Sequence, residues 1–445
     1  MRNKAVKGII VAVAAVCIAA LSFTVGFFTN RCAQSREISS YRWALETINK
    51  NYYFGGVEGG FTQTSLNAIA DTYLDRYSEY YTAEEYKQLL DSNEGKKSGI
   101  GITYAYAAGK GIYISSVTGN SPADEAGMRA GEWIASGVAD GKTVTFGGDD
   151  GGKIFGDYVK DFADGEEMTL NSVDGTVYTV AKSQFTASYT YLCTNESAWI
   201  FDDAETGGFY LKEESGRRIA SLPDGTGYMR LAQFYGSAAE EFSSLVSKFN
   251  ALGCKSLVLD LRTNGGGYVD VMSKIAGAFA DGAKKPSMIA RDKHGKTQTD
   301  YCQKVSDSSR RISKDVKIYV LANSGTASAS EALIGAMVCY GALEYKNIFL
   351  SDYSAEYTDW LKSNKQEVKT AQSFGKGIMQ STFINRSTGE ALKLTTAKIY
   401  WPDGKTCIHD VGLTEKDGCT VVKDVKWQHT KDDEELERVI DAIKA

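Results

Sequence analysis

Hydrophobic and polar positions divide the chain into regions of different pattern. Residues 8–28 carry no charged side chain and are long enough to span a bilayer. Residues 31–93 repeat apolar positions at the spacing of amphipathic helices, whereas 94–183 consist of short strand patterns and turns around one helix signal, SPADEAG. These patterns predict an apolar N-terminal segment at 1–30, a helical segment and then a β-rich module.

Strands and helices alternate over residues 184–445. Apolar strand patterns occur in GYMRLAQF, SLVLDLR and KIYVLAN, and helix patterns lie between and after them, beginning with SAAEEFSSLVSKFNALG. This alternation predicts an α/β domain.

The apolar segment at 8–28 follows Arg2, Lys4 and Lys7. A cleaved signal peptide is the alternative, but FFTNRC offers no convincing cleavage site. We therefore expect an uncleaved, single-pass membrane anchor, with the positive charges in the cytoplasm and the rest of the chain outside.

Composition and charge limit the classes of partner that this protein is expected to bind. The chain is 43% hydrophobic and 24% charged, with a net charge of −6 and no dense block of Lys or Arg. This argues against nucleic acid and favours protein or small-molecule partners.

Cys407 and Cys419 are close enough in sequence for a disulfide, and Cys339 is expected on a core face of a helix. No cysteine or histidine cluster suggests a metal.

The stretch SGTASASEAL, 324–333, follows the KIYVLAN strand and precedes an apolar helix. Ser328 and Glu331 have the spacing of a helix capping box. A strand-to-helix turn is also where a nucleophilic hydroxyl is exposed and where the N–H groups of the first helical turn can stabilise an oxyanion. The stretch alone leaves both interpretations open.

Three consecutive glycines, Gly265 to Gly267, follow the SLVLDLR strand. Neither phosphate-binding glycine pattern occurs here, so a nucleotide site is not indicated. An oxyanion hole and a plain turn both remain.

A serine nucleophile needs a base. The chain has three histidines, each in polar, turn-like sequence: His294, His409 and His429. A Ser-His-Asp triad is therefore possible without positive support. The alternative base is Lys376 in SFGKGIMQST, because a strand over 376–384 would place Lys376 and Gln380 on one face. A solvated loop lysine is the ordinary interpretation of the same residue.

Taken together, the sequence resembles the C-terminal processing peptidases, or tail-specific proteases, from about residue 40 to 425. The resemblance implies a Ser/Lys dyad on an α/β core of the ClpP/crotonase-like type, with an inserted PDZ domain at 94–183. It rests on seven blocks in the family's order: DRYSEYYTAEEY, GIGI with SPADEAGMRAGEWI, GYMRLAQF, LVLDLRTNGGG, TASASEAL, FGKGIMQ and LKLTTAKIYWPDGKTCIHDVGL.

The resemblance also implies residue roles. Ser328 would be the nucleophile, Lys376 the general base and Gln380 the residue that orients the lysine. The N–H groups of Gly266 and Ala329 would form the oxyanion hole.

In the PDZ region the resemblance implies a carboxylate-binding loop made of Gly99, Ile100, Gly101 and Ile102. Such a loop holds the free C-terminus of a peptide that adds to the sheet as a strand. A simple β-turn is the alternative interpretation.

One departure from the family is an insertion. Ser328 and Lys376 are 48 positions apart, more than the family's usual spacing, and the excess lies in SDYSAEYTDWLKSNKQEVKTAQ. It could form a surface loop or a lid. Despite it, we expect Lys376 in an apolar, water-poor pocket within hydrogen-bond reach of Ser328, because only a neutral amine can act as a base.

The sequence therefore predicts a membrane-anchored, extracytoplasmic serine endopeptidase, of a bacterial type, that cleaves proteins near their C-termini through an acyl-enzyme. It would need no metal or cofactor, and it could form oligomers. The alternative is a binding or scaffold protein with a PDZ domain and an inactive peptidase fold.

Overall fold

The computed structural model describes residues 43, 61–139, 141–202, 210–214, 217–280, 284–363, 369–426 and 433–445. The chain divides at Arg76 into two compact units. The first contributes helix α2 (Phe61–Tyr73), and the second begins at Tyr77. Within the described ranges, no helix combines the length and apolar character that a bilayer crossing requires. The predicted anchor at 8–28 lies outside these ranges.

The core of the second unit is a mixed sheet in the order β12-β11-β10-β13-β14-β17-β18-β21. Strands from β13 to β21 pair in parallel, and the β10, β11 and β12 end is antiparallel. The bounds are β10 (Thr190–Cys193), β11 (Ala198–Asp202), β12 (Tyr210–Glu213), β13 (Thr226–Leu231), β14 (Ser256–Asp260), β17 (Lys317–Ala322), β18 (Ile348–Tyr353) and β21 (Thr420–Val425).

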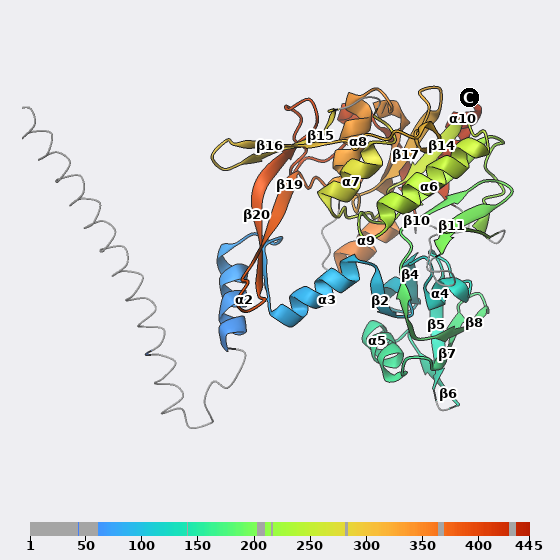
Figure 1. Cartoon of the computed structure of the whole chain (residues 1–445). Coiled ribbons are helices and arrows are strands. Elements are labelled where there is room, and N and C mark those ends of the chain that lie inside the picture. Colours follow the sequence, from blue (N-terminus) through green and yellow to red (C-terminus); the bar gives the residue numbers. More distant parts are fainter. Residues whose placement is uncertain are drawn as a thin grey trace, which may run out of the picture. The chain divides into compact units, whose positions relative to one another are not determined.

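Helices cover both faces of this sheet. Along β14, Leu257 and Leu259 pack in the cluster with α6, α7 and α8, while Val258 packs on the opposite face with α10. Strands buried on both faces explain the continuous apolar runs in the sequence. In Figure 1, α6, α7 and α8 lie together across the sheet. The helices are α6 (Ala238–Ala251), α7 (Val269–Ala276), α8 (Ala329–Cys339), α9 (Ala355–Ser363) and α10 (Glu434–Lys444), with short 3-10 helices at Ser308–Arg310, Tyr345–Asn347 and Glu415–Asp417. The predicted α/β domain is thus confirmed as a mixed α/β fold.

A second sheet has the order β1-β20-β15-β16, with β19 also paired to β20. It corrects part of the helical segment expected at 31–93, because Glu79–Tyr81 forms strand β1 against β20. Two consecutive tyrosines favour a strand once a partner strand is available. Helix α3 (Ala83–Asn93) follows as expected, with a capping box between Thr82 and Glu85. The remaining strands are β15 (Pro286–Asp292), β16 (Thr297–Tyr301), β19 (Ile378–Ile384) and β20 (Ala391–Tyr400).

Residues 96–186 form the β-rich module. Its sheet has the order β3-β4-β5-β7-β8, with β6 paired to β5, and a separate pair of β2 and β9 lies at the two ends of the module's chain. The bounds are β2 (Lys96–Gly99), β3 (Ile102–Ala107), β4 (Gly111–Val117), α4 (Pro122–Glu125), β5 (Trp133–Ala139), β6 (Lys142–Thr145), α5 (Gly151–Asp161), β7 (Glu167–Ser172), β8 (Val177–Ala181) and β9 (Ser183–Thr186).

Helix α5 is an element that the sequence pattern did not predict. Three glycines, Gly151, Gly152 and Gly156, disfavour a helix by propensity. The structure gives the reason for two of them. A Cβ at Gly151 would meet the carbonyl oxygen of Phe146 at 1.8 Å, and one at Gly152 would lie 3.0 Å from the Cβ of Tyr106. Close packing against Phe146 and Tyr106 therefore requires glycine at position 151 and favours it at position 152.

The cysteines answer one question that the sequence left open and correct one expectation. Cys407 and Cys419 are both free thiols, so the suggested disulfide is absent from this pair. Cys339 is exposed at the end of α8 rather than buried on its core face. The helix ends at Cys339, so this position lies beyond the part of α8 that the core covers.

Candidate active site

Ser328 lies at the turn between β17 and α8, as predicted. It is half-buried, and its backbone has φ 58°, a left-handed value that non-glycine residues rarely adopt. Strain of this kind persists only where surrounding contacts enforce it, and it is frequent at functional sites.

The contacts that enforce this turn come from buried polar side chains. The N–H of Asn323 donates to Thr326 Oγ1 at 2.9 Å, and the Thr326 hydroxyl donates to the carbonyl of Leu261 at 2.8 Å. Asn323 Oδ1 in turn accepts the N–H of Thr263 at 2.8 Å. The end of β17 is thereby fastened to the end of β14.

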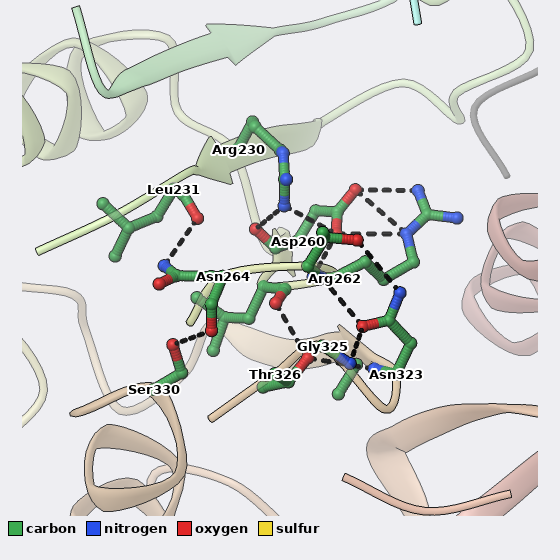
Figure 2. Close-up of polar contacts among 12 residues, drawn as sticks. Arg230, Leu231, Asp260, Arg262, Asn264, Asn323, Gly325, Thr326 and Ser330 are labelled. Atoms are coloured by element: carbon green, nitrogen blue, oxygen red, sulfur yellow. Dashed lines mark hydrogen bonds and ion pairs between the residues drawn. The ribbon is translucent and has the colours of Figure 1, made fainter. Parts of the chain in front are cut away.

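Asn264 joins the glycine loop to the serine turn. Its carbonyl oxygen accepts both the N–H of Ala327 and the hydroxyl of Ser330, each at 2.9 Å. Its side-chain amide donates to the carbonyl of Leu231 in β13 at 2.8 Å. Figure 2 shows Asn264 between Leu231 and Ser330. Three neighbouring strands therefore position one loop.

Gly266 lies directly against the serine turn. Its φ is 96°, and a Cβ there would lie 2.9 Å from Ala327 O, Ala329 N and Ser328 Cβ. Only glycine fits this approach. Gly266, Ser328 and Ala329 therefore lie together, and the oxyanion role of Gly266 and Ala329 stays a prediction. The N–H of Gly266, however, donates to Asn264 Oδ1 at 2.9 Å.

Glu331 is the residue whose role the sequence analysis missed. Fully buried in α8, it accepts the N–H of Ser328 at 3.0 Å and the N–H of Lys376 at 2.9 Å, both on Oε2. Its other oxygen accepts the Ser373 hydroxyl at 2.6 Å and the Gly375 N–H at 2.8 Å. Burial raises the pKa of Glu331, and these donors oppose the rise. In sequence, the S-x-x-E spacing signalled only a capping box.

Lys376 is half-buried and precedes strand β19, which begins at Ile378 rather than at the predicted 376. Its ammonium lies 4.5 Å from the centre of the Tyr77 ring, a cation–π distance. The side-chain amide of Gln380 donates to Thr395 Oγ1 at 2.9 Å across the β19–β20 pair. The base role of Lys376 and the orienting role of Gln380 stay predictions.

The two ends of the insertion are joined by hydrogen bonds. The N–H of Tyr353, at the end of β18, donates to Thr370 Oγ1 at 2.7 Å, and the Thr370 hydroxyl donates to Asp352 at 2.8 Å. Helix α9 lies between these two ends. The chain thus returns to β18 shortly before Lys376, which explains how a long separation in sequence is compatible with proximity.

Two of the three histidines lie within the described residues. His294 is exposed beside Asp292 in the β15–β16 turn. His409 is close to the Lys376 segment, because a Cβ at Gly377 would lie 2.7 Å from its backbone nitrogen. Its Nε2 is 3.4 Å from Asp410 Oδ2. His429 lies outside the described residues.

A buried ionic network supports the start of the glycine loop. Arg262 is fully buried and pairs with Asp260 at 2.7 Å, Asp433 at 2.8 Å and Glu435 at 3.0 Å. Arg230 in β13 reaches Asp260 at 3.2 Å, as Figure 2 shows. Removing one partner from such a network leaves an uncompensated buried charge. The network therefore fixes the end of β14 against α10.

In the β-rich module, the predicted carboxylate loop connects β2 to β3. Gly99 and Gly101 both have positive φ, and Ile100 is buried in the module's core. A Cβ at Gly101 would overlap Ser121 at 2.1 Å. The carbonyl of Gly101 accepts the Thr118 N–H at 2.8 Å. The loop is therefore held in a defined conformation up to Ile102, the first residue of β3.

A serine on a strained strand-to-helix turn, beside a glycine loop, has the geometry of a nucleophile turn in serine hydrolases. Fold and site thus define a candidate serine hydrolase of mixed α/β class. Residues 225–342 match the model of Peptidase family S41.

Relatives extend the similarity beyond that domain. The chain is 28% identical over 409 residues to a probable CtpA-like serine protease of Staphylococcus haemolyticus, covering 91% of this chain and 70% of the relative. A probable CtpA-like serine protease of Staphylococcus epidermidis is 26% identical over 380 residues, or 85% of this chain and 65% of the relative. A solved photosystem II D1 C-terminal processing protease aligns with a TM-score of 0.44 and 20% identity, covering 90% of this chain and 92% of that chain.

Proposed function

We propose that this chain is a serine endopeptidase that cleaves proteins near their C-termini, with Ser328 as nucleophile and Lys376 as general base. The observation that carries the proposal is the convergence of both residues on Glu331, with Gly266 packed against the serine turn. Homologues described as probable CtpA-like serine proteases support the same class of activity.

In the proposed reaction, the Ser328 hydroxyl attacks the scissile carbonyl while neutral Lys376 takes its proton. The oxyanion accepts hydrogen bonds from the N–H groups of Ala329 and Gly266. For this, the Gly266 N–H gives up its hydrogen bond to Asn264 Oδ1. Lys376 then protonates the leaving amine, and water releases the acyl group from Ser328.

The test is incubation of the purified protein with an unstructured protein that ends in an apolar, free C-terminus. We expect cleavage by the wild type and none by Ser328→Ala. Absence of cleavage by the wild type, with binding of the same C-terminus retained, would instead support the alternative of an inactive binding protein.

The β-rich module is proposed to be a PDZ domain that binds substrate C-termini at the Gly99–Ile102 loop. Strand β3 is at the edge of its sheet and follows this loop, so an extended peptide can add to β3 with its carboxylate at the loop. In the full chain carrying Ser328→Ala, peptides with a free C-terminus should bind more tightly than amidated ones. Equal binding would contradict the assignment.

The apolar residues 8–28 are proposed to anchor the protein in a membrane, with the peptidase outside the cytoplasm. Cell fractionation should place the full-length chain in the membrane, accessible to added protease from outside. A soluble mature form beginning near residue 30 would contradict the anchor.

A further inference from the structure

Helix α9, in the middle of the insertion, contacts the β-rich module. The indole Nε1–H of Trp360 donates to the carbonyl oxygen of Tyr106 in β3 at 2.9 Å. In the same helix, Glu356 forms an ion pair with Lys110, which lies in the turn between β3 and β4. Helix α9 thus contacts the end of β3 through the Trp360 hydrogen bond, and the following turn through the Glu356 ion pair.

Tyr106 belongs to the strand edge that a peptide would use. Among the strands that the structure describes, β3 pairs only with β4, and the bond from Trp360 shows that the Tyr106 carbonyl faces a donor outside that pair. An antiparallel strand added to an edge bonds with every second residue. A peptide with its carboxylate at the loop before Ile102 would therefore reach Tyr106 with its residues about four positions upstream.

A chain of aromatic contacts runs from this bond to the serine turn. The rings of Trp360 and Tyr357 stack at 5.6 Å with an interplanar angle of 8°. Tyr357 contacts Tyr353 edge-on at 4.9 Å, and the Tyr353 hydroxyl lies 3.3 Å from the Ser324 hydroxyl. Ser324 begins the SGTASASEAL turn that contains Ser328.

We propose that Trp360 is an internal competitor for the β3 edge: a substrate C-terminus longer than about four residues displaces Trp360 from the Tyr106 carbonyl when it binds. The proposal rests on the proposed peptide-binding function of the module and adds a regulatory element to it. Displacing Trp360 also releases the end of the aromatic chain that reaches the serine turn. Helix α9 then gates binding of the peptide to the β3 edge.

The test measures peptide affinity by fluorescence anisotropy in the full chain carrying Ser328→Ala, so that no peptide is cleaved. With a fluorescent eight-residue peptide ending in a free apolar residue, Trp360→Ala should lower the Kd about tenfold. Trp360→Phe, which keeps a ring but loses the N–H donor, should lower it about threefold, the size of one hydrogen bond. It also serves as the milder variant should the alanine variant fail to fold.

Two controls make the result specific. Phe383→Ala removes another aromatic side chain, 55% exposed on β19, and should leave the Kd unchanged. A three-residue peptide with the same C-terminus is too short to reach Tyr106 and should bind the wild type and Trp360→Ala equally.

The outcomes separate the two proposals. If the eight-residue peptide binds in a carboxylate-dependent way but with the same Kd in the wild type and both Trp360 variants, the gate is refuted and the peptide site stands. If amidation does not weaken binding in any of these proteins, the proposed peptide site itself is wrong, and the gate falls with it.

Discussion

Ser328 and Lys376, 48 positions apart, donate their backbone N–H groups to the same oxygen atom, Oε2 of Glu331, at 3.0 and 2.9 Å. A single buried carboxylate therefore sets the distance between the two segments that carry the proposed nucleophile and base. The segment that contains α9 leaves the core after Tyr353 and returns at Thr370. Its length therefore does not affect the distance between the Ser328 and Lys376 segments.

Glu331 is expected to act as a positioning residue. Replacing it with alanine leaves the part-buried N–H donors of Ser328 and Lys376 and the buried N–H donor of Gly375 without this acceptor, at about 1 kcal/mol or more for the buried group. Glu331→Gln keeps one acceptor oxygen but directs an amide NH2 at other donors. We predict a lower kcat with little change in KM for Glu331→Gln, together with a lower free energy of unfolding.

The check combines steady-state kinetics with denaturant unfolding on the same preparations. Ser328→Ala is the reference, since it should abolish turnover without lowering stability comparably. Wild-type kcat in a stably folded Glu331→Gln variant would contradict the positioning role.

Gly266 and Gly265 form a matched pair. A Cβ at position 266 would lie 2.9 Å from Ser328 Cβ and from the Ala329 nitrogen, at a φ of 96°, whereas a Cβ at position 265 meets no described atom within 4 Å. Alanine keeps the backbone N–H, but its Cβ would force that N–H out of position, so we predict that Gly266→Ala lowers kcat/KM about 100-fold, as when one oxyanion donor is lost. Gly265→Ala should retain nearly full activity, and similar losses in both variants would argue against the assigned oxyanion position.

Lys376→Arg tests the base directly. Arginine keeps the positive charge and can still lie over the Tyr77 ring, but its guanidinium cannot accept a proton at neutral pH. The variant should fold normally and lose turnover about as fully as Ser328→Ala. His409→Ala is the control, because His409 lies beside Gly377 and is the nearby alternative base. Substantial turnover in Lys376→Arg, with none in His409→Ala, would reverse the assignment.

A pH-dependent stability is expected from Glu241 in α6. Its side chain accepts the N–H groups of Tyr189 and Thr190 at 2.8 and 3.0 Å, yet burial raises its pKa from 4.5 to about 6. The folded state then keeps a proton that the unfolded state has already lost. The free energy of unfolding should therefore fall as the pH rises from about 4.5 to about 6, by up to about 2 kcal/mol.

The measurement for Glu241 is denaturant unfolding across that pH range, compared with Glu241→Gln. The glutamine still accepts hydrogen bonds but does not titrate, so the difference between the two proteins isolates this group from other buried carboxyls. A constant difference between pH 4.5 and 6 would contradict the prediction.

Much of the site was predictable because its parts are local. The strand before Ser328, the glycine loop after β14 and the helix after the serines each follow from short-range pattern, and α8, β14 and β17 occur where expected. The close approach of Gly266 to Ser328 also agrees with the requirement for glycine. Each of these features is encoded by a short stretch of neighbouring residues.

The features that were missed depend on distant partners. Glu331 has the spacing of an ordinary helix cap, and only the folded chain brings Gly375 and Lys376 to its carboxylate. Helix α5 contains glycines that local propensity disfavours, yet close contact with Phe146 requires glycine at position 151. The bond between Trp360 and Tyr106 joins two regions with no relation in sequence. No local pattern encodes such contacts.

The central claim is that Ser328 is a nucleophile activated by Lys376. The most direct test is to treat the protein with a fluorophosphonate, in which a nucleophilic serine displaces fluoride from phosphorus, and to locate the adduct by mass spectrometry. We predict a single adduct on Ser328 in the wild type, formed at least about tenfold more slowly in Lys376→Arg. An adduct elsewhere, or equally fast labelling of Ser328 in Lys376→Arg, would contradict it.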